Sequence, residues 1–357
     1  MKQILVLVPK LSVIGGVANY YSAIKPFLPD TFVYFIRGGR GQSIKSQKAL
    51  LHFFDYFRFV FKLLLNPKIE AILINTSISK ASLYRDSLFL IIAKKVFRKK
   101  TVVFFRGWED EIIESLILKR PYWLLISFLE SDKIIVLANH FKDQILSMGY
   151  NKPIIVETTT VNKAYFNNII QPIQPDNGFY HILFMARVEE NKGVFELLYA
   201  FEKLNKLYSD VVLDIGGKGG ALQSLKDYVK LKRIKNINFH DYVSGEMKIR
   251  LYQLASVLAF PSYHGEGMPN TVLESMAFGL PVITTKVGGL VDFFQNGKMG
   301  YWVEPKNSEQ LFEKLKFLYL NKEIGRQIGE TNKKYAESQF ISDVVATRLI
   351  SHLNFSA

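Results

Sequence analysis

The sequence predicts an α/β protein in which two doubly wound, Rossmann-like domains are each built on a parallel β-sheet. Strand-like apolar runs alternate with helix-like patterns through both halves of the chain, which is typical of parallel sheets covered by helices. A polar, proline-bearing stretch at residues 167–178 separates the halves and indicates a linker. The 357 residues suffice for two domains of ordinary size, each with its own core.

The first half contains six candidate strands, the first of which leads into Gly15, Gly16 and a helix from Val17. Each is a short apolar run between polar or turn-forming residues. They span residues 4–8, 32–36, 71–74, 101–105, 133–137 and 154–156.

The second half also contains six candidate strands, at residues 182–186, 211–215, 237–240, 257–260, 282–285 and 300–303. A helix is expected from Thr271 to Phe278, ended by Gly279 and Pro281. We therefore expect domains at residues 1–165 and 179–335, joined by a linker at 166–178. A helix at 336–357 is expected to pack back toward the first domain.

Composition favours an intracellular, cytoplasmic enzyme. The chain has no cysteine, which excludes disulfides and thiolate metal sites. Its start resembles a signal peptide only superficially, because the apolar run at residues 4–8 ends at Pro9 and is better explained as a first strand. Lysines and arginines interrupt every longer apolar run before about 18 residues, so no membrane-spanning helix is expected.

Positive charge is concentrated in the first half. Residues 1–165 hold 24 Lys and Arg against 12 Asp and Glu, a balance of +12, whereas residues 166–357 hold 22 against 20, a balance of +2. Basic clusters at residues 94–95, 98–100 and 119–120 adjoin aromatic and aliphatic residues, which favours an anionic membrane surface as partner. No nucleic-acid-binding motif is present, so nucleic acid is not expected as a partner.

Residues 46–65 predict a helix that is apolar around most of its circumference. His52, Asp55, Arg58 and Lys62 form its narrow polar stripe. Such a helix is either a crossover helix packed on the sheet or one dipped into lipid, and the sequence leaves both interpretations open.

Residues 265–281, GEGMPNTVLESMAFGLP, place Glu266 in a loop and Glu274 one turn inside the following helix. Carboxylates accept hydrogen bonds from sugar hydroxyls, and N–H groups at a helix start receive phosphate, so one segment can hold a sugar nucleotide. The alternative is a capping box from Thr271 to Glu274, with Glu266 as a solvated loop acid.

These residues resemble the GT-B fold, retaining glycosyltransferases of family 4, also called glycosyl transferases group 1. The family hallmark EGxPNxxLEAMAxGxPVIxTxxGG is matched from Glu266 to Gly289 by EGMPNTVLESMAFGLPVITTKVGG. A second hallmark, G-R-x-x-x-x-K-G after a strand, is matched at residues 186–193, with Ala186 in place of the usual glycine. The resemblance is strong over residues 180–305 and covers the first half only in outline.

Arg187 and Lys192 of the second hallmark suit a departing nucleoside diphosphate, because fixed cations stabilise the negative charge that grows on it. Lys192 also precedes a helical pattern, where a helix start adds partial positive charge. The alternative is that both cations pair with Glu189 and Glu190 on a solvated loop.

The resemblance implies that the second domain binds the donor and the first the acceptor, in a cleft between them. It implies that Glu266 holds the transferred sugar and Glu274 the ribose, and that Arg187, Lys192 and Glu266 are catalytic. The remaining donor-binding residues that it implies are Gly15, Gly16, Tyr242, Val243, Gly267, Met268, Pro269, Asn270 and Thr271. No D-x-D pair is present, so a metal-independent reaction is expected, with the nucleoside-diphosphate sugar as substrate and no cofactor.

One departure concerns residues 106–108, Arg-Gly-Trp, where many members of the family have a His-Gly pair. A guanidinium stays protonated, so Arg106 does not act as a base. Arg106 and Trp108 are expected on the acceptor side. His264 is a lesser candidate for a donor contact, and the glycines at 216–220 give only a weak dinucleotide signal.

The sequence thus predicts a retaining, metal-independent hexosyltransferase that acts on a lipid-linked or surface-polysaccharide acceptor, such as lipopolysaccharide or capsule, on the inner face of the cell membrane. Two alternatives remain: a module that binds sugar nucleotide without turnover, and an epimerase of the same fold. Donor base, sugar, acceptor and linkage are not specified by the residues.

Overall fold

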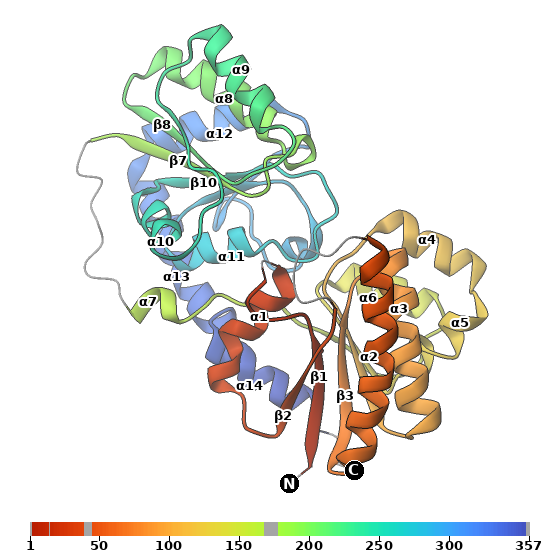
Figure 1. The fold of residues 1–357 in the computed structure, drawn as a ribbon. Helices are drawn as coiled ribbons and strands as arrows, with labels where there is room; N and C mark the ends of the chain where they lie inside the picture. Colours follow the sequence, from red (N-terminus) through yellow and green to blue (C-terminus); the bar gives the residue numbers. More distant parts are fainter. Residues whose placement is uncertain (1, 14, 39–44, 168–177, 355–357) are drawn as a thin grey trace. The chain divides into compact units, whose positions relative to one another are not determined.

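The computed structural model describes residues 2–13, 15–38, 45–167 and 178–354, and for residues 45–52 the backbone only. The chain forms two compact units (Figure 1). Unit 1 comprises Met1–Asn162, Gly265–Met268 and Ser342–Ala357, and unit 2 comprises Lys163–His264 and Pro269–Ile341. Most of the predicted linker, at residues 168–177, lies outside the described residues.

Unit 1 is built on a six-stranded parallel sheet in the order β2-β1-β3-β4-β5-β6. The strands are β1 (Gln3–Val8), β2 (Phe32–Ile36), β3 (Ile69–Thr76), β4 (Lys100–Phe105), β5 (Lys133–Val136) and β6 (Ile154–Val156). The helices are α1 (Gly16–Ile24), η1 (Lys25–Phe27), α2 (Lys45–Leu65), α3 (Lys80–Ile91), η2 (Ile92–Val96), α4 (Asp110–Lys119), α5 (Tyr122–Leu125), η3 (Phe128–Glu130), α6 (Asn139–Ser147) and α14 (Ser342–His352).

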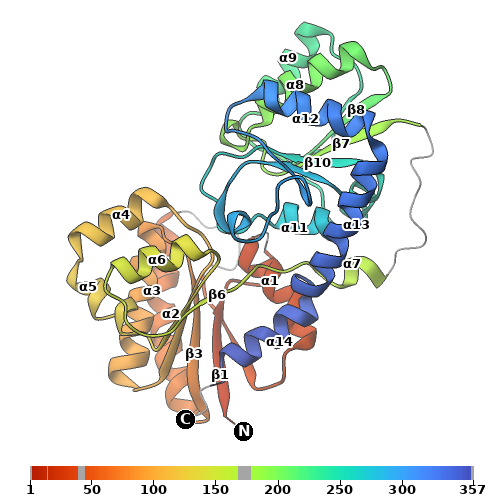
Figure 2. The ribbon, with the colours of Figure 1, turned by 180° about the vertical axis from the view of Figure 1, so that it is seen from behind.

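Unit 2 is built on a second six-stranded parallel sheet, in the order β12-β11-β10-β7-β8-β9. Its strands are β7 (Tyr180–Met185), β8 (Val211–Gly216), β9 (Ile237–Phe239), β10 (Val257–Phe260), β11 (Val282–Thr284) and β12 (Gly300–Trp302). Its helices are α7 (Ala164–Asn167), η4 (Glu190–Lys192), α8 (Val194–Leu207), α9 (Leu222–Lys232), α10 (Gly245–Leu254), α11 (Asn270–Ala277), η5 (Gly288–Asp292), α12 (Ser308–Leu320) and α13 (Lys322–Gln339). Figures 1 and 2 show α8, α9 and α12 on one side of the sheet and α11 and α13 on the other.

Two doubly wound parallel sheets confirm the predicted fold class. The apolar runs form buried strands because helices on both faces remove them from water. Every predicted strand is present, with boundaries within two residues of the prediction. Each sheet buries its own cluster of aliphatic and aromatic side chains.

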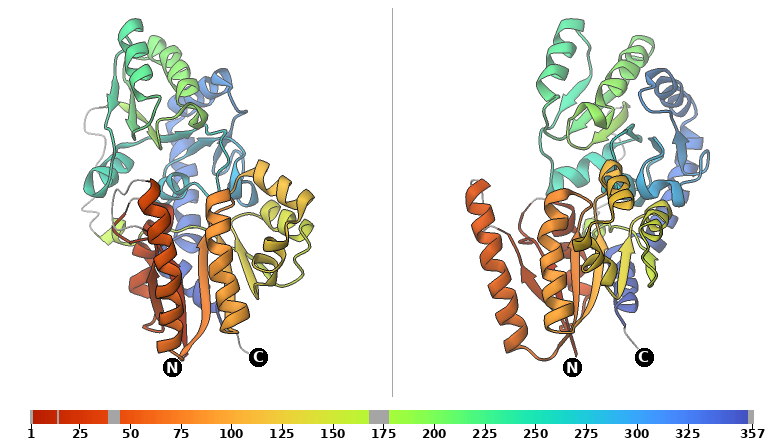
Figure 3. Two further views of the ribbon diagram at one scale, coloured as in Figure 1. Left: turned by 45° about the vertical axis from the view of Figure 1, so that its right-hand side comes forward. Right: turned by 90° about the vertical axis from the view of Figure 1, so that its right-hand side faces the viewer.

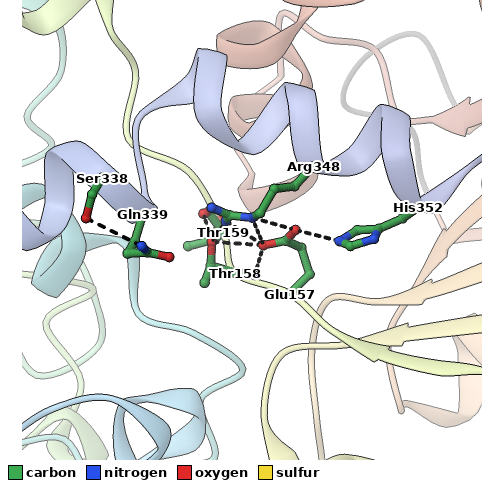
Figure 4. A network of polar contacts seen from close by, with 7 residues as sticks. All are labelled: Glu157, Thr158, Thr159, Ser338, Gln339, Arg348 and His352. Carbon is green, nitrogen blue, oxygen red and sulfur yellow. Dashed lines mark hydrogen bonds and ion pairs between the residues drawn. The ribbon is translucent and has the colours of Figure 1, made fainter.

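The C-terminal helix α14 packs on the core of unit 1 through Val345, Ala346 and Leu349. A polar network also holds it in place (Figure 4). The Arg348 guanidinium donates to both oxygens of Glu157, at 2.6 and 3.0 Å, and the His352 ring lies 3.1 Å from the same carboxylate. The last helix of the chain is therefore a structural part of the unit that the N-terminus begins.

The predicted helix at residues 46–65 is α2, and its two sides differ in burial. Phe59 and Leu63 are buried, and the Phe59 ring packs at 5.6 Å from Phe35 and 5.1 Å from Phe89. The core interpretation is correct for that side. The opposite side carries large apolar residues that are exposed to solvent.

Candidate functional site

The two sequence hallmarks meet at the carboxyl ends of β7 and β10 in unit 2. These strands are neighbours in the sheet, and the chain runs from β7 toward β9 on one side and from β10 toward β12 on the other. This reversal of strand order is a topological switch point, where ligands bind in open α/β sheets. Backbone and side-chain hydrogen bonds join the loops: Tyr263 and Ser262 both donate to the carbonyl of Asn191.

Gly193 shows how closely the two loops approach. Its φ is 72°, in the left-handed region, and an added Cβ would lie 2.2 Å from the carbonyl oxygen of Pro261. Only glycine fits this position without displacing the backbone. Lys192 directly precedes Gly193 and the start of α8, and its side chain is only 5% exposed. The lysine is therefore built into the switch point rather than carried on a solvated loop.

Arg187 is more accessible than Lys192. Its side chain is 64% exposed and forms an ion pair with Glu189, with 2.9 Å between Nη1 and Oε1. The alternative that the arginine pairs with a neighbouring acid thus describes its present contact. An exposed pair of this kind contributes little stability, so the guanidinium can exchange partners at small cost.

The glycine-rich loop at residues 216–220 supports the segment that carries Arg187. Val188 donates to the Lys218 carbonyl at 3.0 Å, and a Cβ on Gly217 would lie 1.8 Å from the Ala186 oxygen. These glycines permit close packing of two backbones. Their weak resemblance to a dinucleotide fingerprint therefore has a structural explanation.

Glu274 lies inside α11, is 6% exposed, and takes part in a polar network. Lys248 donates to its Oε1 at 2.7 Å, and the Tyr252 hydroxyl donates to its Oε2 at 2.8 Å. Thr271 lies 3.2 Å from the same hydroxyl, and no side-chain cap bond is present at the start of α11. The carboxylate is held by α10 rather than by its own helix, which argues against the capping box.

Lys248 places a positive charge beside the Glu274 carboxylate. Burial alone would lower the pKa of this lysine, but its interactions with Glu274, Tyr165 and Tyr242 together outweigh burial and the pKa is raised. The ammonium group also lies 5.6 Å from the centre of the Tyr165 ring. Glu274 is therefore a partly neutralised acceptor, with a lysine and a tyrosine fixing both of its oxygens.

Two buried amide oxygens in this part of unit 2 have no hydrogen-bond partner. They are Oδ1 of Asn191, beside Lys192, and Oδ1 of Asn270, the first residue of α11. A buried acceptor without a partner costs free energy, and such atoms mark positions that water or a ligand completes. Both belong to the loops that meet at the switch point.

The segment at residues 240–243 is positioned by a buried carboxylate on β8. Asp214 accepts from His240, 2.7 Å away, and from His181, also at 2.7 Å. Burial would raise the pKa of Asp214, but the hydrogen bonds of these two histidines outweigh it and the pKa is lowered. Gly217 then donates to the carbonyl of Asp241 at 2.5 Å. Of the predicted pair, Tyr242 is exposed and Val243 is buried.

The remaining predicted residues belong to unit 1. Gly15 and Gly16 lead into α1, and nothing lies within 4 Å of an added Cβ at either. Glu266, Gly267 and Met268 are grouped with this unit, where Met268 packs on its core. Pro269, Asn270 and Thr271 belong to unit 2 and begin α11. His264 is exposed.

Arg106 and Trp108 are held within unit 1. The guanidinium of Arg106 lies 3.9 Å from the centre of the Tyr20 ring and 4.3 Å from that of Phe104, and burial lowers its pKa. Its Nη1 is buried without a hydrogen-bond partner. Trp108 is 4% exposed and stacks on Phe141 at 4.1 Å. In this structure Trp108 is a core residue.

Sequence reasoning missed Lys248, Tyr252, His181 and Asp214. Lys248 and Tyr252 stand four residues apart in the helix α10, a spacing that places both side chains on one face. That spacing is common, and only the position of α10 beside α11 gives it meaning.

In the described residues, no group of His, Asp or Glu has an arrangement that holds a metal ion. No helix in that same part is long and apolar enough to span a membrane.

Solved structures with the same arrangement define the class of fold. A glycosyltransferase from Rickettsia africae matches with a TM-score of 0.73 and 16% identity, covering 98% of this chain and 97% of that one. Anabaena Alr3699/HepE, solved in complex with UDP and glucose, matches with a TM-score of 0.72 and 14% identity over 99% of both chains. The fold is the GT-B fold of glycosyltransferases.

The family comparison is more specific for the second half of the chain. Residues 166–335 match the family described as Glycosyl transferases group 1. The capsular polysaccharide biosynthesis glycosyltransferase CapM of Staphylococcus aureus is 28% identical over 220 residues, 61% of this chain and 57% of that protein. The O-antigen chain mannosyltransferase C of Escherichia coli is 28% identical over 170 residues, 47% of this chain and 44% of that protein. The matches thus span about half the length of these relatives.

Proposed function

We propose that the protein is a retaining glycosyltransferase that moves a sugar from a nucleoside diphosphate to a lipid-linked or surface-polysaccharide acceptor at the cytoplasmic membrane face. The observation that carries the proposal is the switch point of unit 2, where buried Lys192 and Glu274 come from two hallmark segments. The family match over residues 166–335 supports the class of reaction. The relatives named for capsule and O-antigen synthesis support the class of acceptor.

The donor is a nucleoside-diphosphate sugar, which agrees with the UDP and UDP-glucose complexes of the Anabaena neighbour. Glu274 accepts hydrogen bonds from the ribose hydroxyls, while Lys192 and Arg187 face the diphosphate. The first amides of α11 add N–H donors and the positive end of a helix dipole. Glu266 binds the hydroxyls of the transferred sugar.

The reaction breaks the bond between the anomeric carbon and the β-phosphate oxygen and forms a bond from that carbon to an acceptor hydroxyl oxygen on the same face. The acceptor proton passes to the departing phosphate oxygen, so nucleoside diphosphate and glycoside are the only products. Lys192 and Arg187 stabilise the charge that develops on the leaving group. No metal ion is required, because these cations take its place.

Replacing Glu274 by Ala tests the assignment. We expect a folded protein that has lost most sugar transfer, measured with radiolabelled donor and membrane-extracted acceptor. Glu309→Ala, at an exposed glutamate on α12, is the matched control and should retain full activity. Unchanged transfer in Glu274→Ala would show that this carboxylate does not take part in donor binding.

The alternatives differ from transfer in their products. A binding module without turnover would bind donor but neither transfer nor hydrolyse it, which a donor-hydrolysis assay detects. An epimerase would convert free donor to its epimer without acceptor. Recovery of unchanged donor sugar in the absence of acceptor, together with a glycosylated acceptor in its presence, supports the transferase.

A further inference from the structure

The helix α2 presents a continuous apolar face to solvent. Six of its large apolar side chains are more than half exposed, namely Phe53, Phe54, Phe57, Phe61, Leu64 and Leu65. Their spacing places them along one side of the helix, and we call these six residues the α2 ridge. Surface helices ordinarily carry polar residues on their outer face. Figure 3 shows α2 as the outermost helix on its side of unit 1.

The ridge is not needed to attach α2 to its own unit. Phe59 and Leu63 on the opposite side are buried in the core of unit 1, and Tyr56 packs at 4.6 Å from the Phe89 ring. The Tyr56 hydroxyl also donates to the Arg85 carbonyl on α3 at 3.1 Å. The exposed aromatic residues therefore represent apolar surface beyond what folding uses, and such patches mark interaction sites.

The charges around the ridge are positive. The sequence gives α2 and α3 one acid each, Asp55 and Asp86, and both are buried. Asp55 accepts from the Gly38 amide at 2.8 Å, and Asp86 is paired with Arg37. Among the side chains that the structure describes, the basic residues of these helices that reach solvent are Arg58, Lys62, Lys80 and Arg85. Arg58 also pairs with Asp55, and Arg85 with Asp86. The outer surface of both helices thus combines apolar and basic groups without an exposed carboxylate.

The apolar surface continues from α2 onto the neighbouring helix. Tyr84 and Leu88 on α3 are 60% and 40% exposed. Tyr84 also lines a groove of about 680 Å³ in unit 1, together with Trp123, whose ring centre lies 4.8 Å from that of Tyr84. An acceptor with a lipid anchor at the ridge would have this groove beside it for its polar head.

We propose that the α2 ridge inserts into an anionic bilayer surface, with Arg58 and Lys62 against the lipid headgroups. This inference rests on the proposed membrane-bound acceptor and names the surface that meets the membrane. Interfacial helices bind by burying an apolar face while basic flanks meet anionic lipids. A second copy of the chain fits less well, because a symmetric contact would set the basic flanks of both copies against each other.

Vesicle sedimentation of the full chain tests the proposal. The wild-type protein should bind vesicles of phosphatidylglycerol and phosphatidylcholine and bind pure phosphatidylcholine weakly. The double variant Phe57→Ser, Phe61→Ser should lower the partition coefficient at least about tenfold, since two buried phenyl groups are lost from the lipid contact. The double variant Leu207→Ser, Leu231→Ser removes exposed leucines of unit 2 and should leave partitioning unchanged.

Four further readouts make the outcome decisive. Equal melting temperatures of the variants and wild type exclude unfolding as the cause, and Phe57→Trp should show a blue-shifted emission that brominated lipids quench. Equal partitioning of both double variants would overturn the proposal, as would a lipid-free dimer that the ridge variant dissociates. Sugar-nucleotide binding is measured separately. Lipid binding without donor binding would reject the proposed function while leaving the membrane surface in place.

Discussion

Lys192 is the residue on which the proposed chemistry depends most. It is buried directly before Gly193, a residue with positive φ whose added Cβ would lie 2.2 Å from the Pro261 carbonyl oxygen. A cation held in this way needs no reorganisation when charge develops on a leaving group, which is the condition for strong electrostatic stabilisation. Arg187, by contrast, is exposed and paired with Glu189, so its role requires an exchange of partners.

Replacing Lys192 by Ala should lower kcat about 10²- to 10³-fold, by analogy with the removal of one oxyanion-hole donor. Steady-state kinetics with a saturating donor checks this expectation. Lys206→Ala, at a lysine that is 70% exposed on α8, is the control and should behave like wild type. A kcat within twofold of wild type in Lys192→Ala would show that the leaving group departs without this cation.

Motifs carried in one segment were predictable from sequence, and contacts between segments were not. Glu274 and Lys192 could be selected as candidates because each lies in a dense pattern of residues over fewer than about 25 positions. Lys248 and Asp214 stand alone in their segments, and their roles arise only when α10 reaches α11 and when β7, β8 and β9 align. Trp108 was expected on the acceptor side, but the structure buries it against Phe141.

Among the elements, the loop from β7 to α8 and the loop after β10 act as one unit. Gly193 fixes their contact through its positive φ and through the space beneath the Pro261 carbonyl. The strands were predicted to within two residues at each end, since parallel strands are apolar throughout and end at turn-forming residues. The single helix expected at residues 336–357 is instead the end of α13 and the separate helix α14. The loops between the elements were not predicted, because their conformation depends on tertiary contacts.

Replacing Gly193 by Ala should destabilise unit 2 by at least about 1 kcal/mol and weaken donor binding, because the left-handed conformation and the carbonyl contact both become strained. Urea denaturation followed by far-ultraviolet circular dichroism measures the stability. Gly220→Ala is the matched control, since nothing lies within 4 Å of its added Cβ. Equal midpoints for the two variants would show that the β7–α8 loop tolerates a side chain at Gly193.

The helix α14 is anchored to the rest of unit 1 by Glu157. Burial would raise the pKa of this carboxyl, but hydrogen bonds from His352 and Arg348 outweigh burial and lower the pKa to about 2. A carboxyl whose folded pKa is depressed stabilises the fold above its unfolded pKa of 4.5. That stability is lost as the pH falls from about 4.5 toward 2.

Replacing Glu157 by Gln should therefore remove roughly 3 kcal/mol of stability at neutral pH and flatten its dependence on pH below about 4.5. Chemical denaturation across this range is the measurement. Glu323, whose pKa is also lowered to about 2 by Arg326, is fully exposed and serves as a control. Solvent screens that pair, so Glu323→Gln should change little. If the free energy of unfolding of wild type and of Glu157→Gln changed with pH in the same way, this role of Glu157 would be contradicted.

At the scale of the whole molecule, the two units carry different chemistry. Unit 2 contains Arg187, Lys192, Glu274 and most of the matched family segment. Unit 1 contains Glu266, the basic charge, the α2 ridge and the groove beside Tyr84. Their common fold class, two parallel sheets, was predictable because strand and helix signals alternate from end to end. The apolar face of α2 was visible in the sequence, yet only the structure separates its core side from its exposed side.

Transfer by the full chain should need no added divalent ion, because Lys192 and Arg187 supply positive charge at the switch point. Activity is measured after dialysis against EDTA and again with magnesium or manganese restored. We expect the rate to stay within about twofold throughout, less than the change that removal of a leaving-group cation causes. Loss of activity with EDTA and recovery with magnesium would show that a metal ion carries part of the leaving-group charge.

The central claim is that the switch point of unit 2 binds a nucleoside-diphosphate sugar, and donor-induced thermal stabilisation tests it most directly. A panel of UDP, GDP and ADP sugars is added to the wild-type protein and to Lys192→Ala, Glu274→Ala and Lys206→Ala. Ligand that binds the folded state raises the melting temperature. We predict that one base raises the melting temperature of wild type and Lys206→Ala, and that the shift is lost in the other two variants. Stabilisation by no member of the panel, or equal stabilisation of all four proteins, would contradict the account.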